Sequence, residues 1–246
     1  MNKKQANVTI LGTSFVSVTM DEMIGTLMAH VNKREKAFVV TANPEIALHA
    51  YEDKPYRRVI QKANYVTADG IGIVKAASWT DQYIPERVAG FDLFLRLLEE
   101  ANENSLRVYL LGAKPHVFEK AKDVLREQYP NMIIAGGHHG YFDFHDDAIA
   151  DDVRQSGADL VFVALGFPRQ EEWIAKEIDK MDKGIFIGIG GSFDVMAGEV
   201  KRAPLFWQNL NLEWLYRLVM QPTRFKRMLA LPKFVLTVLK DRKKRR

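Results

Sequence analysis

The sequence predicts an α/β protein with a doubly wound, Rossmann-like parallel sheet, followed by a helical, basic C-terminal appendage. Short apolar runs alternate with amphipathic stretches of about 10–15 residues along most of the chain, a pattern typical of parallel βαβ units. The alternation stops after about residue 199, and from residue 204 only helical patterns remain, interrupted by Pro222 and Pro232. We therefore expect an α/β domain over residues 1–200 and an amphipathic, basic helical appendage over residues 201–246.

The composition is that of a globular protein. The chain has 246 residues, 47% of them hydrophobic, which is enough for a substantial core. It contains no cysteine, which excludes disulfides and thiolate metal sites and suits a reducing cytoplasm. No signal-like segment follows the N-terminus, and no apolar run approaches the roughly 20 residues that span a bilayer. We expect a cytoplasmic protein without a membrane-spanning segment.

The charge is divided unevenly along the chain. Residues 217–246 contain 11 Lys and Arg and one acid, a net charge of +10, whereas the remainder carries 24 bases and 30 acids, or −6; together they give +4. The same segment has aromatic and aliphatic residues at helical spacing beside its cations, as interfacial membrane binding requires. Nucleic-acid binding is the alternative for a basic tail, but the acidic body and the apolar helical faces argue against it.

The first third of the chain predicts two strands and three helices. Residues 8–11 form a first strand, and residues 19–33 form a helix in which Thr19 and Glu22 have the spacing of a capping box. A second strand covers residues 37–41, after which Pro44 opens a helix at its first position. A basic helical stretch over residues 56–62 leads into the next strand.

The segment TADGIGIV (67–74) is the predicted chemical centre. A strand over residues 65–68 delivers the carboxylate of Asp69 into a turn punctuated by Gly70 and Gly72, the position where open α/β sheets bind ligands. A structural alternative is that Asp69 only caps the helix predicted over residues 71–79. A further packed helix is predicted over residues 91–101.

The second half of the chain alternates regularly. Strands are predicted over residues 107–111, 132–135, 160–165 and 185–189, and helices over residues 115–129 and 146–155 and from about residue 170. Parallel strands place their carboxyl ends at one edge, where ligands gather. That edge should present a set of polar and glycine residues, namely Thr41, Asn43, Asp69, Gly112, Gly166, Gln170 and Asp194.

Several common sites are absent from the pattern. Gly70 and Gly72 lack the third glycine of a dinucleotide fingerprint, because Lys75 occupies its place, and the chain has no Walker loop. The chain has no Asp-x-Asp motif, whose carboxylates commonly hold a Mg²⁺ ion against a diphosphate group. If the ligand carries a diphosphate, arginines and backbone amides should stabilise it in place of the metal ion. The histidines and acids of GGHHGYFDFHDD (136–147) have no metal-ligand spacing, and we expect a polar loop whose acids cap the next helix.

Eight spaced segments together resemble the WecG/TagA/CpsF glycosyltransferase family. In chain order they are TANPE (41–45), TADGIGIV (67–74), ERVAGFD (86–92), LLGA (110–113), GYF (140–142), ALGFPRQEEWI (164–174), GIGGSFDVMAGEVKRAP (188–204) and LEWLYRL…PTR (212–224). The resemblance covers nearly the whole chain, and no single motif carries it.

The resemblance implies a step in wall teichoic acid linkage-unit synthesis. N-acetylmannosamine would move from UDP-ManNAc to undecaprenyl-diphosphate GlcNAc, forming a β-1,4 bond with inversion and without a metal or other cofactor. The family's catalytic base falls on Asp69. Its donor-binding residues fall on Thr41, Asn43, Arg87 and Gln170, with Asp194 assigned to the same pocket, and its diphosphate-stabilising arginines fall on Arg217, Arg224 and Arg227.

The resemblance also implies a location and leaves alternatives. A lipid acceptor places the protein peripherally on the inner face of the cell membrane, docked on anionic lipid through its tail. A sibling enzyme for another UDP-sugar, or a membrane-recruited nucleotide-sugar binding module without catalysis, would have the same features. The apolar faces of the C-terminal helices can bind a membrane or pack on the same helices of another copy, so a homo-oligomer in solution is a further expectation.

Overall fold

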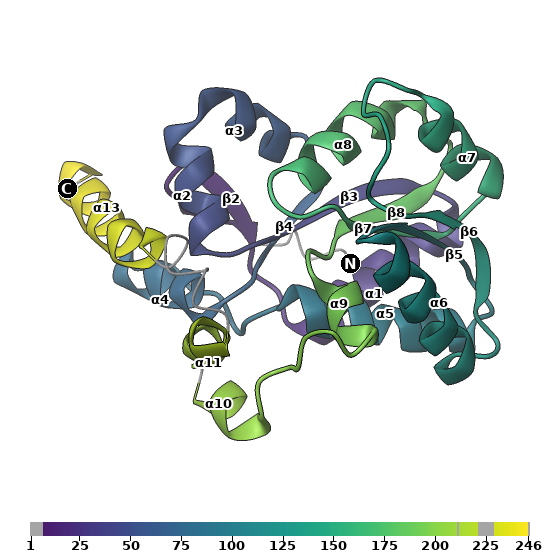
Figure 1. The fold of residues 1–246 in the computed structure, drawn as a ribbon. Coiled ribbons are helices and arrows are strands. Elements are labelled where there is room, and N and C mark those ends of the chain that lie inside the picture. Colours follow the sequence, from purple (N-terminus) through teal and green to yellow (C-terminus); the bar gives the residue numbers. More distant parts are fainter. Residues whose placement is uncertain (1–6, 211, 221–228, 246) are drawn as a thin grey trace.

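The computed structural model describes residues 7–210, 212–220 and 229–245. Six strands form the central sheet in the spatial order β4-β3-β8-β7-β5-β6 (Figure 1). Their bounds are β3 Lys36–Ala42, β4 Tyr65–Ala68, β5 Arg107–Gly112, β6 Ile133–His138, β7 Leu160–Ala164 and β8 Gly184–Gly188. Every neighbouring pair is parallel, so all six carboxyl ends lie at the same edge of the sheet. The predicted fold class is confirmed.

Helices cover both faces of this sheet, because the central strands are apolar on both sides. One apolar core includes side chains of α1 (Met20–Lys33), α5 (Gly90–Glu103), α6 (Pro115–Gln128) and α9 (Ser192–Met196). The opposite core includes side chains of α2 (Pro44–Glu52), α3 (Lys54–Gln61), α4 (Ile71–Trp79), α7 (Ala148–Ser156) and α8 (Arg169–Glu177), the last followed by the 3₁₀ turn Ile178–Lys180. In Figure 1, α2, α3, α7 and α8 lie above the sheet and α1, α5, α6 and α9 lie below it, whereas α4 lies at the lower left, near α13.

Two predicted helix starts are confirmed in atomic detail. The Thr19 side chain accepts from Glu22 N, and the Glu22 side chain accepts from Thr19 N, which is the reciprocal pairing of a capping box. Pro44 occupies the first turn of α2, where its missing N–H has no helical partner to lose. These starts are fixed by local chemistry, independently of the sheet.

The first predicted strand lies outside the parallel sheet. β1 (Asn7–Ile10) pairs antiparallel with β2 (Thr13–Val16) in a separate hairpin. Leu11 and Gly12, the two residues between the strands, both have positive φ, as a type I′ hairpin turn requires. The second strand of this hairpin was not predicted.

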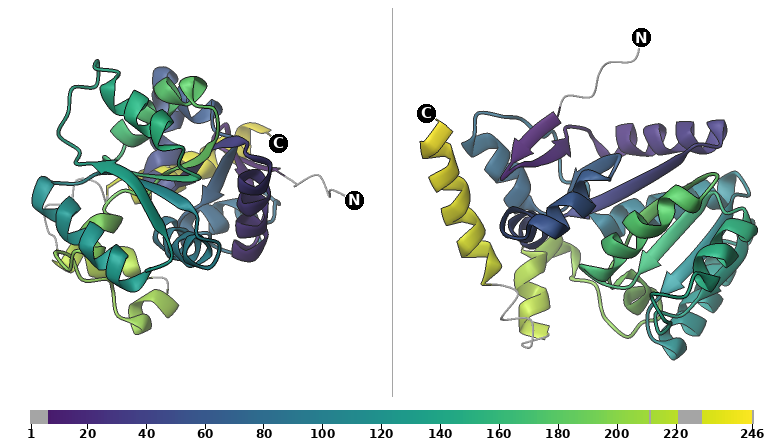
Figure 2. Two further views of the ribbon diagram at one scale, coloured as in Figure 1. Left: turned by 90° about the vertical axis from the view of Figure 1, so that its right-hand side faces the viewer. Right: turned by 90° about the horizontal axis from the view of Figure 1, so that it is seen from above.

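The C-terminal region is helical, as expected. It contains α10 (Leu205–Asn209), α11 (Glu213–Met220) and α13 (Ala230–Arg245), of which α13 packs beside α2 and α4 at one end of the molecule (Figures 1 and 2). Phe234 and Val238 are buried in the core shared with α2 and α4, and Lys233 pairs with Glu52 at 2.7 Å. Within the described ranges, no helix is long and apolar enough to cross a membrane.

Phe234→Ala is expected to release α13 from the body. Truncating a fully buried Phe costs about 3–5 kcal/mol, and a terminal helix can lose its docking without global unfolding. Limited trypsin digestion should cut the Lys- and Arg-rich α13 much faster in this variant than in the wild type. Leu236→Ala, on the same helix but 60% exposed, is the matched control and should be cut at the wild-type rate. Equal cleavage of all three proteins would contradict the docked position.

Candidate active site

Most of the predicted site residues come together where β4, β3, β8 and β7 end. Thr41 is the penultimate residue of β3, and Asp69 follows β4 directly. Gln170 lies in the first turn of α8 after β7, and Asp194 lies in α9 after β8. Gly112 ends β5, farther along the same edge. The sheet topology thus collects these residues as the strand pattern predicts.

Asp69 is held at the strand end by its backbone. Its N–H donates to the carbonyl oxygen of Ala42 on the neighbouring strand at 3.0 Å. The following helix, α4, has Gly70 as its N-cap residue, so Asp69 does not occupy the capping position of the structural alternative. Gly72 has no room for a side chain, since a Cβ there would lie 2.7 Å from Cγ of Pro44. The turns after β3 and β4 therefore pack directly on each other beside Asp69.

Gly90 brings a third segment against the two strand ends. It is the first residue of α5, and a Cβ built on it would lie 2.7 Å from Oγ1 of Thr41 and 3.5 Å from Oδ2 of Asp69. The approach is fixed just upstream, where Val88 N–H donates to Ala68 O at 3.1 Å. The strand pattern does not single out this residue, although it lies within the motif segment ERVAGFD (86–92).

Thr41 and Asn43, at the carboxyl edge of the sheet, both make hydrogen bonds to the protein backbone. The Thr41 hydroxyl donates to the carbonyl oxygen of Gly188 on β8 at 3.3 Å. Oδ1 of Asn43 accepts from Ile46 N at 3.0 Å and caps α2. This leaves the Asn43 amide nitrogen as the group of that side chain that can donate to a ligand.

Gln170 is buried and engaged at both ends of its amide. Its Oε1 accepts from Gly190 N at 3.0 Å, and its Nε2 donates to Oε1 of Glu171 at 2.7 Å. Burial raises the pKa of Glu171 to about 7. Asp194 lies over the same turn, because a Cβ on Gly191 would come within 3.5 Å of its Oδ2. Gln170 thus shapes the turn after β8, where Asp194 is placed.

Arg87 belongs to a chain of ion pairs at the start of α5. Its guanidinium contacts Asp92 at 3.3 Å and Glu213 of α11 at 3.5 Å. Asp92 also pairs with Arg202, whose guanidinium lies 4.8 Å from the centre of the Phe91 ring. Asp92, Arg202 and Glu213 were not predicted as site residues, although each lies within a motif segment. This series of ion pairs connects α11 of the appendage to the start of α5, at the edge of the site.

The predicted C-terminal arginines are only partly within the described residues. Arg217 lies on α11, where its backbone is described and its side chain is not. Arg224 and Arg227 lie outside the described residues. Their assignment stays a prediction.

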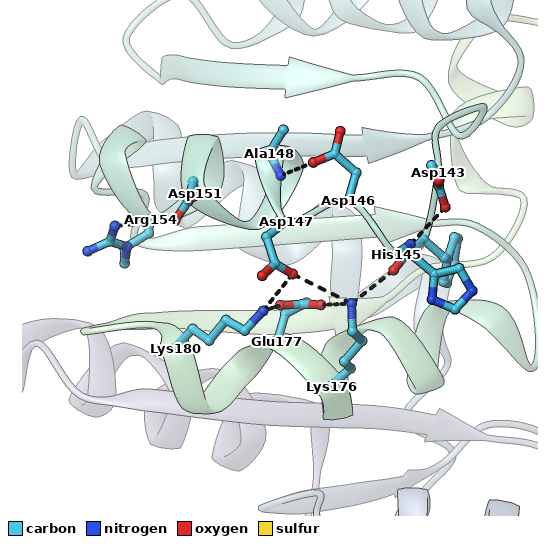
Figure 3. A network of polar contacts seen from close by, with 11 residues as sticks. Asp143, His145, Asp146, Asp147, Ala148, Asp151, Arg154, Lys176, Glu177 and Lys180 are labelled. Atoms are coloured by element: carbon cyan, nitrogen blue, oxygen red, sulfur yellow. Dashed lines mark hydrogen bonds and ion pairs between the residues drawn. The ribbon is translucent and has the colours of Figure 1, made fainter.

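The loop after β6 is a polar loop pinned to α8 (Figure 3). Asp147 pairs with Lys180 at 2.8 Å and Lys176 at 3.7 Å, and both lysines also reach the buried Glu177. A hydrogen bond from Lys180 lowers the pKa of Asp147, so the stability that this pair contributes is lost as the pH falls through that lowered value. Asp146 accepts from Ala148 N just before α7, whereas the N-cap residue, Asp147, makes no side-chain capping hydrogen bond, so the expected cap is only partly present. Among the described residues, no three His, Asp or Glu side chains form a metal-binding group.

Comparison with known proteins identifies relatives over nearly the full chain. The model described as "Glycosyl transferase WecG/TagA/CpsF family" matches residues 8–246. An N-acetylglucosaminyldiphosphoundecaprenol N-acetyl-beta-D-mannosaminyltransferase of Bacillus subtilis (strain 168) is 40% identical over 239 residues, covering 97% of this chain and 93% of that protein. The protein of that name from Staphylococcus aureus (strain MW2) is 37% identical over 241 residues, covering 97% and 94%.

Gly90→Ala is expected to damage the site while sparing the fold. Alanine suits a helix start, but its methyl group would displace Thr41 or Asp69, and sub-ångström to 1 Å displacements at a reacting centre cost up to about a hundredfold in rate. Turnover in the transfer reaction named for the relatives should fall at least tenfold, with a small change in the unfolding free energy. Gly25→Ala, inside α1 with open space around its Cβ, is the control and should keep full activity. Wild-type turnover by Gly90→Ala would show that Thr41 and Asp69 need not hold this geometry.

Proposed function

The chain belongs to the WecG/TagA/CpsF glycosyltransferase family, and from that premise we propose that it transfers N-acetylmannosamine from UDP-ManNAc to undecaprenyl-diphosphate GlcNAc. The observation that carries the proposal is the carboxylate of Asp69 at the end of β4, beside Gly90, which also lies against Thr41, in a chain 40% identical to a transferase of that acceptor lipid. The product would serve as the linkage unit of wall teichoic acid.

Asp69 is the proposed general base. It takes the proton from the 4-hydroxyl of the acceptor GlcNAc as that oxygen attacks the anomeric carbon of the donor sugar. The bond from this carbon to the β-phosphate oxygen breaks, and UDP leaves from the opposite side. A single displacement of this kind inverts the anomeric centre and gives a β-1,4 bond. The position of Asp69 directly after a buried strand supports this role, because the rigid sheet holds the carboxylate in place.

The remaining edge residues are proposed to bind the donor. Thr41, Asn43, Gln170 and Asp194 line the turns after β3, β7 and β8 and would position the nucleotide sugar. Arg87, together with Arg217, Arg224 and Arg227, would neutralise the departing diphosphate. Planar guanidinium groups bind diphosphate oxygens in pairs and can supply the charge stabilisation that a metal ion gives in other enzymes.

The appendage is proposed to hold the enzyme on the inner face of the membrane. Many large apolar side chains of the described C-terminal residues are exposed, namely Leu205, Phe206, Leu210, Trp214, Val219, Met220, Leu229, Leu236 and Leu239. Such side chains beside lysines and arginines favour an interface with anionic lipid, which is also where a polyprenyl acceptor resides. Self-association in solution would cover the same apolar groups.

Asp69→Asn is expected to abolish turnover and keep donor binding. Loss of a positioned general base lowers the rate by about 10²–10⁴-fold, whereas an isosteric amide leaves the pocket in shape. Product formation should be measured with UDP-ManNAc and a polyprenyl-diphosphate GlcNAc analogue, with and without EDTA, beside UDP binding by calorimetry.

Asp123→Asn, a change of the same kind on the exposed side of α6, is the control. Full activity of Asp69→Asn would refute the base assignment, and a wild-type rate abolished by EDTA would refute metal independence. Faster wild-type turnover with another UDP-sugar would assign a sibling activity, and absence of product with every donor would leave a binding module.

The pair Leu205→Glu and Phe206→Glu is expected to weaken membrane binding. Both side chains are mostly exposed, so the fold should tolerate the change, while two carboxylates oppose contact with anionic lipid. Cosedimentation with phosphatidylglycerol vesicles should fall severalfold, and turnover of a lipid acceptor in those vesicles should fall with it. Ile133→Glu, at the start of edge strand β6, is the control and should bind as the wild type does. Unchanged vesicle binding by the double variant would contradict the proposed docking surface.

A further inference from the structure

Two polar residues in the first turn of α8, Gln170 and Glu171, are almost completely buried. Gln170 is 4% exposed and Glu171 is 1% exposed, whereas the next residue, Glu172, is on the surface. Polar side chains are rarely buried to this extent unless hydrogen bonds or function require it. The proposed reaction gives Glu171 no part.

The two side chains form a directed hydrogen-bond chain that ends on the backbone of the site. Glu171 Oε1 accepts from Gln170 Nε2 at 2.7 Å, and Gln170 Oε1 accepts from Gly190 N at 3.0 Å. A carboxylate can only accept hydrogen bonds, and a backbone N–H can only donate them. An ionised Glu171 therefore permits a single orientation of the Gln170 amide, the one that presents its oxygen to Gly190.

Close packing leaves the side-chain amide of Gln170 little room to move. A Cβ on Gly188 would lie 2.5 Å from Nε2 of Gln170, so the amide crosses directly against the end of β8. On the other side of β8, the neighbouring strand β3 holds the same strand end, because the Thr41 hydroxyl donates to Gly188 O at 3.3 Å. The β8 turn, which leads to Gly191 and Asp194, is thus fixed between two polar side chains.

We propose that Glu171 is a positioning residue for donor binding, which acts by holding the Gln170 amide and, through it, the turn at Gly190. This inference rests on the proposed function, because it assigns that turn to the UDP-sugar site. If Glu171 loses its charge, the Gln170 amide can invert and set its NH₂ group against the Gly190 N–H. The turn then relaxes, and the donor binds less tightly.

The surroundings of Glu171 support a charge that changes near neutrality. Burial raises its pKa to about 7, partly opposed by the hydrogen bond from Gln170 and by the nearby Tyr56 hydroxyl, and the negative charge of Glu172 on the same helix raises it further. On the facing helices lie the Tyr56 hydroxyl of α3 and, around that tyrosine, Glu45 and His49 of α2. The hydroxyl and Glu171 Oε2 have no partner of good hydrogen-bond geometry within the described residues.

The direction of the pH effect follows from these groups. Above pH 7 Glu171 is ionised and holds the turn, and below pH 7 it takes up a proton and can donate instead of accept. The KM for UDP-ManNAc should therefore rise as the pH falls through about 7, while kcat at saturating donor changes little.

Glu171→Gln tests the inference, with Glu172→Gln as the matched surface control. We expect Glu171→Gln to raise KM for UDP-ManNAc, and the Kd for UDP by calorimetry, by roughly tenfold or more, the effect of a lost hydrogen bond to a charged group. Its kcat should stay within about threefold of the wild type, and the inflection of KM near pH 7 should disappear. Glu172→Gln should keep the wild-type KM and the inflection.

Tyr56→Phe and His49→Gln separate Glu171 from other titrating groups. Tyr56→Phe removes a nearby hydroxyl that favours the ionised carboxylate, so the inflection of KM should move to higher pH. His49→Gln should leave the inflection in place. A wild-type KM and pH profile in folded Glu171→Gln, or an inflection that vanishes in His49→Gln, would overturn the inference. Absence of wild-type turnover and of UDP binding would instead overturn the proposed function.

Discussion

The geometry of the site depends on the close contact of three backbone segments at the carboxyl edge of a parallel sheet. Thr41, at the end of β3, donates to Gly188 of β8 and lies against Gly90, which also approaches Asp69. The start of α5 can come this close only because residue 90 has no side chain. An aspartate at the end of a neighbouring strand is thereby held between a helix start and a strand, with little freedom to move.

The local part of this architecture could be predicted from the sequence, and the long-range part could not. The capping box of Thr19 and the helix start at Pro44 depend on neighbouring residues, so spacing alone reveals them. The insertion of β8 and β7 between β3 and β5 depends on pairing between distant segments, which apolar periodicity does not encode. The hairpin at Leu11 and Gly12 was missed although a short two-residue turn between apolar runs was present in the sequence.

The site shows the same division. Asp69 and Thr41 could be placed because a residue that follows a parallel strand must lie at its carboxyl edge. The contacts of Gly90, Glu171 and Arg202 arise between segments that only the fold brings together. Glu171 in particular has the sequence position of an ordinary acid in the first turn of a helix, where carboxylates are common on the surface. Only the packing of α8 against α3 and β8 buries it and gives it the Gln170 amide to hold.

The ion pairs at the start of α5 link the appendage to the edge of the candidate site. Within the part of the chain that the structure describes, Arg87 and Arg202 pair with Asp92 and Glu213, so two guanidinium charges lie beside two carboxylates. The proposed role of the C-terminal arginines would bring further positive charge to this place. Glu213, which reaches Arg87, is on α11, and Arg217 follows it by four residues, so the helix carries both positions on one face. One contact between the appendage and the body is thus made by the same helix that carries Arg217, the first of the proposed diphosphate-binding arginines of the C-terminal region. Membrane binding by the appendage and assembly of the cationic part of the site would then be one event.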